Sequence, residues 1–382
     1  MAGIYIHIPF CRQACHYCNF HFATSLKHAG EMTDAIISEI ALTPYMGNEK
    51  TPVKTVYFGG GTPSILNISD LSRLFDAVYK KFNVEADAEI TLEANPDDIR
   101  SEKISEWRRL GVNRFSVGIQ SFDDTELQWM HRAHSAAESA ACIEKIRNAG
   151  FSNFSADLIY GSPLMTDDSW KKNIDTVLEK NIPHISCYAL TVEPKTALGK
   201  LVALHKKEDV DPEKQARQFL ILMDRMQQAG YDHYEISNFA KPGMRSRHNS
   251  SYWSGETYYG FGPSAHSFDG NHRSWNVSNN SIYMMKLQEG IIPAETELLT
   301  PTQRLNEYIM TSLRTAEGLS LDYVADHFNE RNAVQLKKQS TKWASTGKLY
   351  ESGGRLVLSN EGKLFADGIA ADLFFNDDGS VS

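Results

Sequence analysis

Residues 8–20 read Ile-Pro-Phe-Cys-Arg-Gln-Ala-Cys-His-Tyr-Cys-Asn-Phe, and this stretch is the most informative part of the chain. The three cysteines, Cys11, Cys15 and Cys18, have the spacing C-x3-C-x2-C. Three thiolates can hold three irons of a 4Fe-4S cluster and leave the fourth iron open to an external ligand. The spacing therefore predicts an iron-sulfur site of the catalytic kind.

A closed zinc site is the main alternative for these cysteines. His16 or His21 could complete a Cys3His set, and thiolate and imidazole are good zinc ligands. A disulfide framework is disfavoured because five cysteines is an odd number and a chain of this length does not need covalent staples. Cys142 and Cys187 stand in apolar surroundings and are expected to be buried.

Composition limits the class of protein. The chain has 382 residues, of which 41% are hydrophobic, and this is enough for one large domain and a smaller one. Its net charge of -9 provides no general attraction to nucleic acid, so we expect no nucleic-acid partner. No apolar run is long enough to span a bilayer, and no secretory signal precedes the cysteines. We therefore expect a soluble, cytoplasmic protein.

The first 190 residues alternate between two patterns. Short runs rich in β-formers occur at 4–8, 55–58, 89–93, 114–120, 154–160 and 184–191. Apolar residues at helical spacing occur between them, as at 33–43, 69–82, 136–149 and 169–180. This alternation predicts six βα units in a parallel sheet, two fewer than a closed eight-stranded barrel needs.

Unusual polar groups follow almost every predicted strand. They are the cysteines after the first strand, Gly59 to Pro63 after the second, 93–96 at the third, 120–122 at the fourth and Asp157 in the fifth. Parallel barrels place their sites at the carboxyl ends of the strands, so these groups should converge on one mouth. Gly59 to Gly61 lacks the spacing of the dinucleotide and phosphate-loop motifs. The run predicts either close approach of the backbone to a ligand or a tight turn.

These motifs together resemble the radical S-adenosylmethionine (SAM) superfamily, and within it the coproporphyrinogen dehydrogenase-like group, the HemN and HemW branch. The resemblance is carried by segments 5–11, 58–64, 93–96, 116–122, 131–134 and 157–161, in that order. It implies an incomplete (β/α)6 barrel, a 4Fe-4S cluster on Cys11, Cys15 and Cys18, and SAM as a second cofactor. It also implies that SAM is bound by Tyr5, Tyr17, Gly60, Gly61, Thr62, Glu93, Gln120, Arg132 and Asp157.

Three features favour the HemW-type haem chaperones within that group. Phe20 stands where the oxygen-independent coproporphyrinogen III dehydrogenases have a further cysteine, and their long segment before the cluster is not expected here. Residues 247–253 resemble the H-N-x-x-Y-W segment of the chaperones, which implies that His248 binds haem. Arg245 and Arg247 could then meet the haem propionates.

The resemblance therefore implies a carrier that delivers haem to a recipient, such as a membrane-associated respiratory haem protein, and that uses an electron donor. The enzyme alternative is conversion of coproporphyrinogen III to protoporphyrinogen IX, and whether the protein is an enzyme stays open at this point. A zinc-stabilised binding module without redox chemistry is the third hypothesis.

The last part of the chain has a different pattern. Helical spacing at 302–315, 321–328 and 333–346, a hairpin at 350–359 and a helix at 361–374 predict a winged-helix-like α+β domain. Without a basic recognition helix, this domain is expected to cover a substrate or bind a partner. The predicted organisation is a partial barrel over 1–240, a loop-rich connection near the barrel mouth over 241–300, the winged-helix-like domain over 301–375 and a disordered tail over 376–382.

Overall fold

The computed structural model describes residues 2–47 and 51–376. Its main feature is a twelve-stranded sheet in the order β12-β11-β10-β9-β1-β2-β3-β4-β5-β6-β8-β7. The six central strands run parallel and in chain order. They are β1 (Ala2–Ile8), β2 (Pro52–Gly60), β3 (Asn83–Ala94), β4 (Arg114–Gln120), β5 (Phe154–Tyr160) and β6 (His184–Ala189). All six predicted strands are confirmed.

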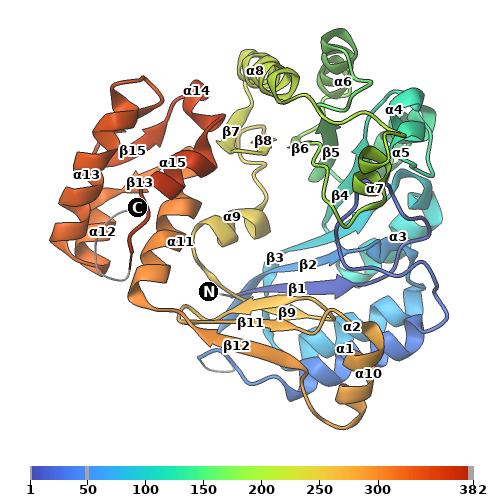
Figure 1. The fold of residues 1–382 in the computed structure, drawn as a ribbon. Coiled ribbons are helices and arrows are strands. Elements are labelled where there is room, and N and C mark those ends of the chain that lie inside the picture. Colours follow the sequence, from blue (N-terminus) through green and yellow to red (C-terminus); the bar gives the residue numbers. More distant parts are fainter. Residues whose placement is uncertain (1, 48–50, 377–382) are drawn as a thin grey trace.

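Helices cover the outer face of these strands (Figure 1). The sheet helices are α1 (Ala29–Leu42), α2 (Ile68–Lys81), α3 (Ser101–Leu110), α5 (Ala136–Asn148), α6 (Asp167–Glu179) and α8 (Pro212–Gln228). Helix α2 shows why they form: Leu71, Leu74 and Val78 recur at helical spacing and are all buried. Asn67 starts that helix by accepting a hydrogen bond from the backbone N–H of Asp70.

The strands carry apolar side chains on one face and polar ones on the other. On β1, Ile4 and Ile6 are fully buried in the core beneath the helices, whereas the ring of Tyr5 lies near Glu93 on the inner face. The same alternation separates Leu158 from Asp157 on β5. Parallel strands covered on both faces are usually apolar throughout, so a polar inner face indicates an interior built to hold a polar ligand.

The barrel is open at its side. Strand β6 pairs with the antiparallel β8 (Asn238–Ala240), which pairs in turn with β7 (Asp232–Glu235). At the other edge, β1 pairs with the parallel β9 (Thr257–Phe261). The two edges therefore continue outward instead of joining, and the predicted incomplete (β/α)6 barrel is confirmed.

The prediction of a loop-rich connection over 241–300 is wrong in its secondary structure. This segment contains α9 (Arg247–Trp253), β9, β10 (His266–Phe268), β11 (His272–Asn276), α10 (Asn280–Gln288) and β12 (Ala294–Leu298). The edge strands escaped detection because they lack a buried apolar pattern: all five residues of β12 are exposed. Helix α9 lies on the concave side of the sheet (Figure 1).

The C-terminal part forms a second hydrophobic cluster around a small three-stranded sheet. Its elements are α11 (Pro301–Leu313), β13 (Leu319–Ser320), α12 (Leu321–His327), α13 (Glu330–Ala344), β14 (Leu349–Ser352), β15 (Arg355–Leu358), α14 (Asn360–Lys363) and α15 (Ala366–Asp372). Three helices followed by a hairpin confirm the winged-helix-like domain, although the predicted last helix is divided in two. Of the predicted tail, residues 377–382 lie outside the described residues. No helix among residues 2–47 and 51–376 combines the length and apolarity needed to cross a membrane.

A buried carboxyl group joins the barrel to its β9–β12 extension. Glu39 of α1 accepts hydrogen bonds from the backbone N–H of Gly262 (2.8 Å), from the amide of Asn276 (2.6 Å) and from the hydroxyl of Tyr283. Burial raises the pKa of Glu39 to about 7. The folded protein thus holds the Glu39 proton at pH values where the unfolded chain has released it.

This raised pKa predicts a pH-dependent stability. The contribution of protonated Glu39 is complete below about pH 4.3 and is lost as the pH rises through about 7, a difference on the order of 3 kcal/mol. We expect the wild-type protein to lose more unfolding free energy between pH 5 and pH 8 than Glu39→Gln, as measured by urea denaturation. Glu31→Gln, an exposed position on the same helix, is the control. Equal pH dependence of the wild type and Glu39→Gln would contradict the argument.

Candidate functional site

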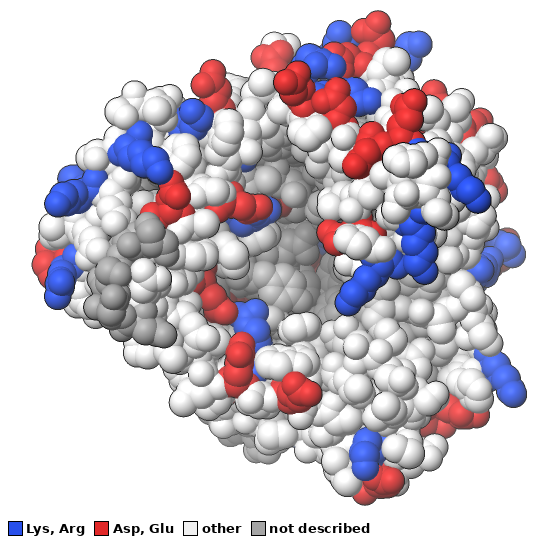
Figure 2. Space-filling view, in the orientation of Figure 1, with Lys and Arg blue, Asp and Glu red and all other residues white. Residues whose placement is uncertain are grey.

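One cavity of about 450 Å³ brings together the thiols and most of the predicted SAM residues. The residues of the prediction that line it are Cys11, Cys15, Cys18, Tyr17, Gly60, Gly61, Thr62, Glu93, Gln120, Arg132 and Asp157. They come from the ends of different strands and the loops that follow, as the barrel topology requires. Figure 2 shows a hollow at the centre of one face of the molecule, between the C-terminal domain and the barrel. Tyr5 and His248 do not line the cavity.

The cysteines lie on the loop between β1 and α1. Backbone bonds hold this loop, because Cys11 N donates to Ala23 O (3.0 Å) and Ala23 N donates to Pro9 O (2.9 Å). Arg132 Nη1 lies 3.3 Å from Cys15 Sγ as a donor, and a second donor reaches Cys11 Sγ from Thr62 Oγ1 at 3.5 Å. Burial raises the pKa of Cys11 to about 11, so its thiolate needs a positively charged partner. Three partly buried free thiols with donors to sulfur fit an iron-sulfur cluster.

The histidines of the zinc alternative do not complete a ligand set. The His16 ring stacks on His131 with a centroid distance of 4.6 Å, and its Nδ1 accepts a hydrogen bond from Lys207 Nζ at 3.0 Å. His21 Nε2 lies 2.7 Å from Asn280 Oδ1. Among residues 2–47 and 51–376, His, Cys, Asp and Glu side chains nowhere form a ready-made metal cage. The cysteines thus face a shared cavity as an open set, which favours the cluster over a closed zinc site.

The glycine run packs against the cysteine loop. Gly60 has a φ of +105°, and its N–H donates to Glu93 Oε2 at 3.1 Å. A Cβ on Gly61 would lie 2.4 Å from the carbonyl oxygen of Phe10, the residue before Cys11. Gly61 N and Thr62 N also donate to the backbone of the cysteine loop. The glycines therefore serve both expected purposes, because they form a tight turn and place backbone groups at the cavity wall.

Two partly buried carboxyl groups line the same cavity as the thiols. Glu93 accepts a hydrogen bond from the Tyr57 hydroxyl at 2.8 Å, and burial followed by the charge of Asp157 raises the pKa of Glu93 to about 8. Asp157 accepts hydrogen bonds from Ser116 (2.9 Å) and Ser155 (3.1 Å), and burial raises its pKa as well. Carboxyl groups here can accept hydrogen bonds from ligand hydroxyl or ammonium groups. SAM carries both, and its positive charges would favour the ionised carboxylates.

Arg132 provides the positive charge of the cavity. It is partly buried and forms no ion pair with an Asp or Glu of the described residues. Its Nη2 donates to Asn95 Oδ1 (2.8 Å) and to Gly118 O (2.7 Å), while its buried Nε has no partner. Arg132 lines the cavity, although its Nε itself is not accessible from it. A guanidinium group at this wall could bind the carboxylate of SAM.

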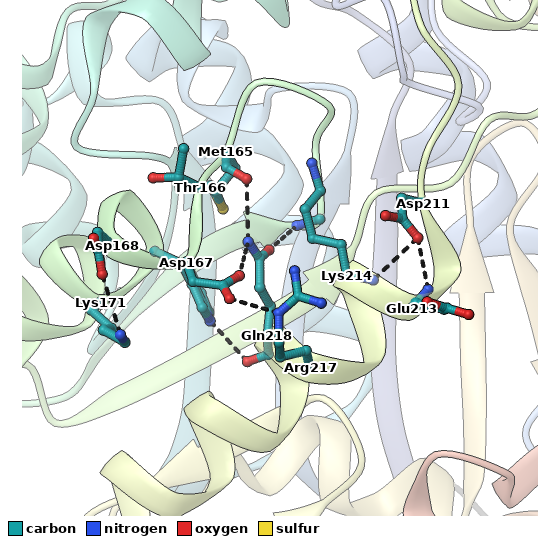
Figure 3. Close-up of polar contacts among 12 residues, drawn as sticks. Met165, Thr166, Asp167, Asp168, Lys171, Asp211, Glu213, Lys214, Arg217 and Gln218 are labelled. Atoms are coloured by element: carbon teal, nitrogen blue, oxygen red, sulfur yellow. Dashed lines mark hydrogen bonds and ion pairs between the residues drawn. The ribbon is translucent and has the colours of Figure 1, made fainter.

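Helix α8 fixes the loop that follows β5 (Figure 3). Gly161 N donates to Gln218 Oε1 (2.9 Å), and Gln218 Nε2 donates back to Met165 O (3.3 Å). Lys214 Nζ donates to the carbonyl groups of Ser162 (2.8 Å) and Pro163 (3.0 Å). These bonds hold the end of β5, and with it the Asp157 side of the cavity, in one position.

Sequence reasoning missed several cavity residues. They include Tyr57, Ser116 and Tyr188. Their signal was available, since all three alternate with apolar residues on their strands and so share the inner face. Tyr5 shares this inner face but lies behind the wall, where it stacks on Tyr57 at 6.0 Å.

The expected haem ligand, His248, lies inside the barrel and not on the cavity wall. The side chain is 1% exposed; its Nδ1 bonds to Thr55 Oγ1 (2.8 Å) and its Nε2 to the Tyr252 hydroxyl (2.9 Å). Burial lowers the pKa of His248 to about 3, so the ring is neutral. It stacks on Tyr57 at 4.9 Å and lies one layer below the cavity, whose wall includes the next residue, Asn249. In this arrangement both ring nitrogens make hydrogen bonds within the protein.

The two arginines proposed for the propionates are also engaged. Arg245 forms ion pairs with Asp232 (2.7 Å) and Glu317 (2.6 Å). Arg247 donates to the carbonyl oxygen of Asp87 at 2.7 Å and lies 3.7 Å from its carboxylate. Both arginines thus contact acidic residues at the surface in this structure.

Comparison with known proteins identifies the class. The Radical SAM superfamily profile matches residues 5–177, and the HemN C-terminal domain profile matches residues 299–365. The structure of coproporphyrinogen III oxidase (HemN) from Escherichia coli superposes with a TM-score of 0.83 at 23% identity, covering 97% of this chain and 89% of that one, and shares the fold. The partial barrel with three cysteines at its mouth is that of a radical SAM protein, whose cofactors are a 4Fe-4S cluster and SAM.

The particular family follows from relatives that match nearly the whole chain. "Heme chaperone HemW" of Bacillus subtilis is 34% identical over 370 residues, covering 96% of this chain and 97% of the relative. "Heme chaperone HemW" of Mycobacterium tuberculosis H37Rv is 34% identical over 376 residues, covering 97% and 94%. The chain belongs to the HemW family.

The close packing of Gly61 on Phe10 predicts a coupling between the glycine run and the cluster. Gly61→Ala would press its methyl group against the Phe10 carbonyl and displace the Cys11 backbone. We expect this variant to retain less than half of the wild-type iron and acid-labile sulfide after anaerobic reconstitution.

Gly30→Ala is the matched control, because a Cβ there meets nothing within 4 Å. It should load the cluster as the wild type does. Full cluster loading in a folded Gly61→Ala protein would show that the two loops are not mechanically coupled.

Proposed function

We propose that this protein binds haem and transfers it to a recipient haem protein, with a 4Fe-4S cluster and SAM held in the barrel cavity. The proposal is carried by one observation: the thiols, glycine run, carboxyl groups and Arg132 share one cavity in a chain whose full-length relatives are named haem chaperones. The HemN structure supports the fold alone and does not favour the decarboxylating enzyme.

Each part of the cavity has a defined task in this proposal. Arg132 binds the ligand carboxylate, while Glu93 and Asp157 bind hydroxyl or ammonium groups. The cluster and SAM supply one-electron reduction and, if SAM is cleaved, a carbon radical. The loop held by α8 keeps the carboxyl side of the cavity in place, so the ligand meets a preformed site.

Phe20 bears on the choice between carrier and enzyme. It lines the cavity beside Cys18, and 71% of its side chain is exposed. The dehydrogenase branch that the sequence resembles has a cysteine at this position, and a phenyl ring cannot replace a thiol in ligation or redox chemistry. An exposed ring at the cavity mouth instead offers an apolar contact surface.

The partners remain part of the proposal. The recipient is a haem protein, of which a membrane-associated respiratory protein is the expected example, and the cluster takes its electron from a separate donor. We place this transfer in the cytoplasm.

A direct comparison of the two activities tests the function. We expect the anaerobically reconstituted protein to bind haem and to transfer it to an apo-recipient, followed by the absorbance of the bound haem. It should form no protoporphyrinogen IX from coproporphyrinogen III with SAM and a reductant, while a HemN-type dehydrogenase is the positive control. Multiple-turnover formation of protoporphyrinogen IX would overturn the carrier assignment, since a carrier has no means of removing propionate carboxyl groups.

A further inference from the structure

A buried histidine lies behind the carboxyl side of the main cavity without lining it. His184 on β6 is fully buried, and Ser155 on β5 stands opposite it in the sheet register. Two residues further along, Asp157 stands opposite Ser186. Because side chains two residues apart share a face of a strand, all four project to the inner face of the barrel. His184 thus lies one side-chain layer deeper in the barrel than Asp157, which lines the cavity.

Hydrogen bonds connect His184 to the carboxyl group of Asp157 in an unbroken chain. At the far end, the Tyr234 hydroxyl of β7 lies 2.7 Å from His184 Nε2. On the other side of the ring, His184 Nδ1 lies 2.9 Å from Ser155 Oγ, and Ser155 Oγ lies 3.1 Å from Asp157 Oδ1. We call these four residues the polar chain. Tyr234 and Ser155 are buried like His184, so bulk water does not replace their hydrogen bonds.

The number of hydrogen atoms in the polar chain sets its direction. Ser155 has one hydroxyl hydrogen, and an ionised Asp157 can only accept it. The His184 ring must then donate to Ser155 through Nδ1–H, which leaves Nε2 as an acceptor for the Tyr234 hydroxyl. The Tyr234 oxygen accepts the backbone N–H of Ser246 at 3.4 Å, so its own hydrogen is available for His184. Every hydrogen of the chain then points toward the Asp157 carboxylate.

The opposite direction of the polar chain is disfavoured. A protonated Asp157 that donates to Ser155 would make Ser155 donate to His184, whose Nε2–H would donate to the Tyr234 oxygen. The Tyr234 hydroxyl hydrogen would then have no acceptor, since His184 and Ser246 are the hydrogen-bond partners of this hydroxyl among residues 2–47 and 51–376. A buried O–H without an acceptor is costly. A protonated Asp157 that donates elsewhere accepts from Ser155 only with the weaker bond of a neutral acceptor. The polar chain therefore favours the ionised carboxylate.

Charged groups outside the polar chain also act on it. The titratable groups that face Asp157 from neighbouring strands are Tyr57, Glu93, Arg114, Cys187 and Tyr188. Burial raises the pKa values of the two tyrosines and the cysteine, so these groups stay neutral. Glu93 opposes the ionisation of Asp157, whereas Arg114 favours it. Burial and then the charge of Arg114 lower the pKa of His184, so its ring stays neutral.

We propose that His184 and Tyr234 are positioning residues that direct the Ser155 hydroxyl hydrogen to Asp157 and so keep this carboxylate ready to accept hydrogen bonds from a bound ligand. This inference deepens the proposed function and rests on it for the identity of the ligand, SAM. Without the ring donor, Ser155 is free to turn away, and the carboxylate loses a hydrogen bond. Such a loss raises the pKa of a carboxyl group by about one unit, so Asp157 would stay protonated to a higher pH.

Infrared difference spectroscopy of the full-length protein without SAM tests this effect directly. The carboxyl absorption of Asp157 is isolated by subtracting the spectrum of the same protein carrying Asp157→Asn, and it is titrated with pH. Leucine at position 184 fills a similar space without a donor, whereas asparagine offers an N–H at the position of Nδ1. We expect the titration midpoint of Asp157 to rise by about one pH unit in His184→Leu and by less in Tyr234→Phe. It should return toward the wild-type value in His184→Asn.

Tyr231→Phe is the matched control, because it removes another buried tyrosine hydroxyl, which donates to the carbonyl oxygen of Ile182 and not to the polar chain. Asp157 should titrate in this control as in the wild type, and circular dichroism verifies that each variant is folded. If His184→Leu does not fold, Tyr234→Phe decides, since it removes only one oxygen atom. An unchanged Asp157 midpoint in the folded variants of His184 and Tyr234 would overturn the proposal.

Calorimetric titration with SAM then connects the polar chain to the ligand. We expect His184→Leu to bind SAM as the wild type does well above the Asp157 midpoint, and about fivefold more weakly at the wild-type midpoint, as a one-unit shift requires. Binding weakened by the same factor at every pH would show a merely structural role and overturn the proposal. A wild type that does not bind SAM, with the infrared shift intact, would instead overturn the proposed SAM site and leave the positioning of Asp157 standing.

Discussion

The structure depends on the difference between the two faces of six parallel strands, of which one is apolar and the other polar. Their outward side chains are apolar and bury against the helices, as Ile6 of β1 and Leu92 of β3 do. Their inward side chains are polar, and Glu93 and Asp157 illustrate the consequence: carboxyl groups are held in the interior with raised pKa values. Such groups are expensive to bury without a ligand or hydrogen-bond donors. The polar interior is stable because each layer of side chains along the barrel axis provides hydrogen-bond partners for the polar groups in it.

Helix α9 provides the layer that lies farther from the barrel mouth and its thiols. The carboxylate of Glu89 accepts hydrogen bonds from the backbone N–H groups of Arg247 (3.1 Å) and His248 (3.0 Å) at the start of the helix. The His248 ring then fills the space next to Gly3 and Thr55 on the inner face of β1 and β2. This layer closes the lower part of the barrel and confines the main cavity to the mouth, where the thiols lie. His248 thus packs beneath the residues that line the main cavity.

Much of the site could be predicted from the sequence because its determinants are local. The cysteine spacing, the glycine run and the strand pattern are each contained in a few consecutive residues, and the barrel topology then brings them together. Contacts between distant residues could not be predicted in this way. The contacts of His248 with Thr55 and of Arg245 with Glu317 are examples, because neither partner is near in sequence. Strand β12 was missed because an exposed edge strand has no apolar period to detect.

The central claim is that three thiols at the barrel mouth hold a cluster whose fourth iron faces a preformed ligand cavity. Mössbauer spectroscopy of protein reconstituted with 57Fe, before and after addition of SAM, tests it most directly. The account predicts that one of the four irons changes its isomer shift and quadrupole splitting when SAM binds, while the three thiolate-bound irons do not. Four irons that are all unaffected by SAM, or a protein that takes up zinc without sulfide, would contradict it.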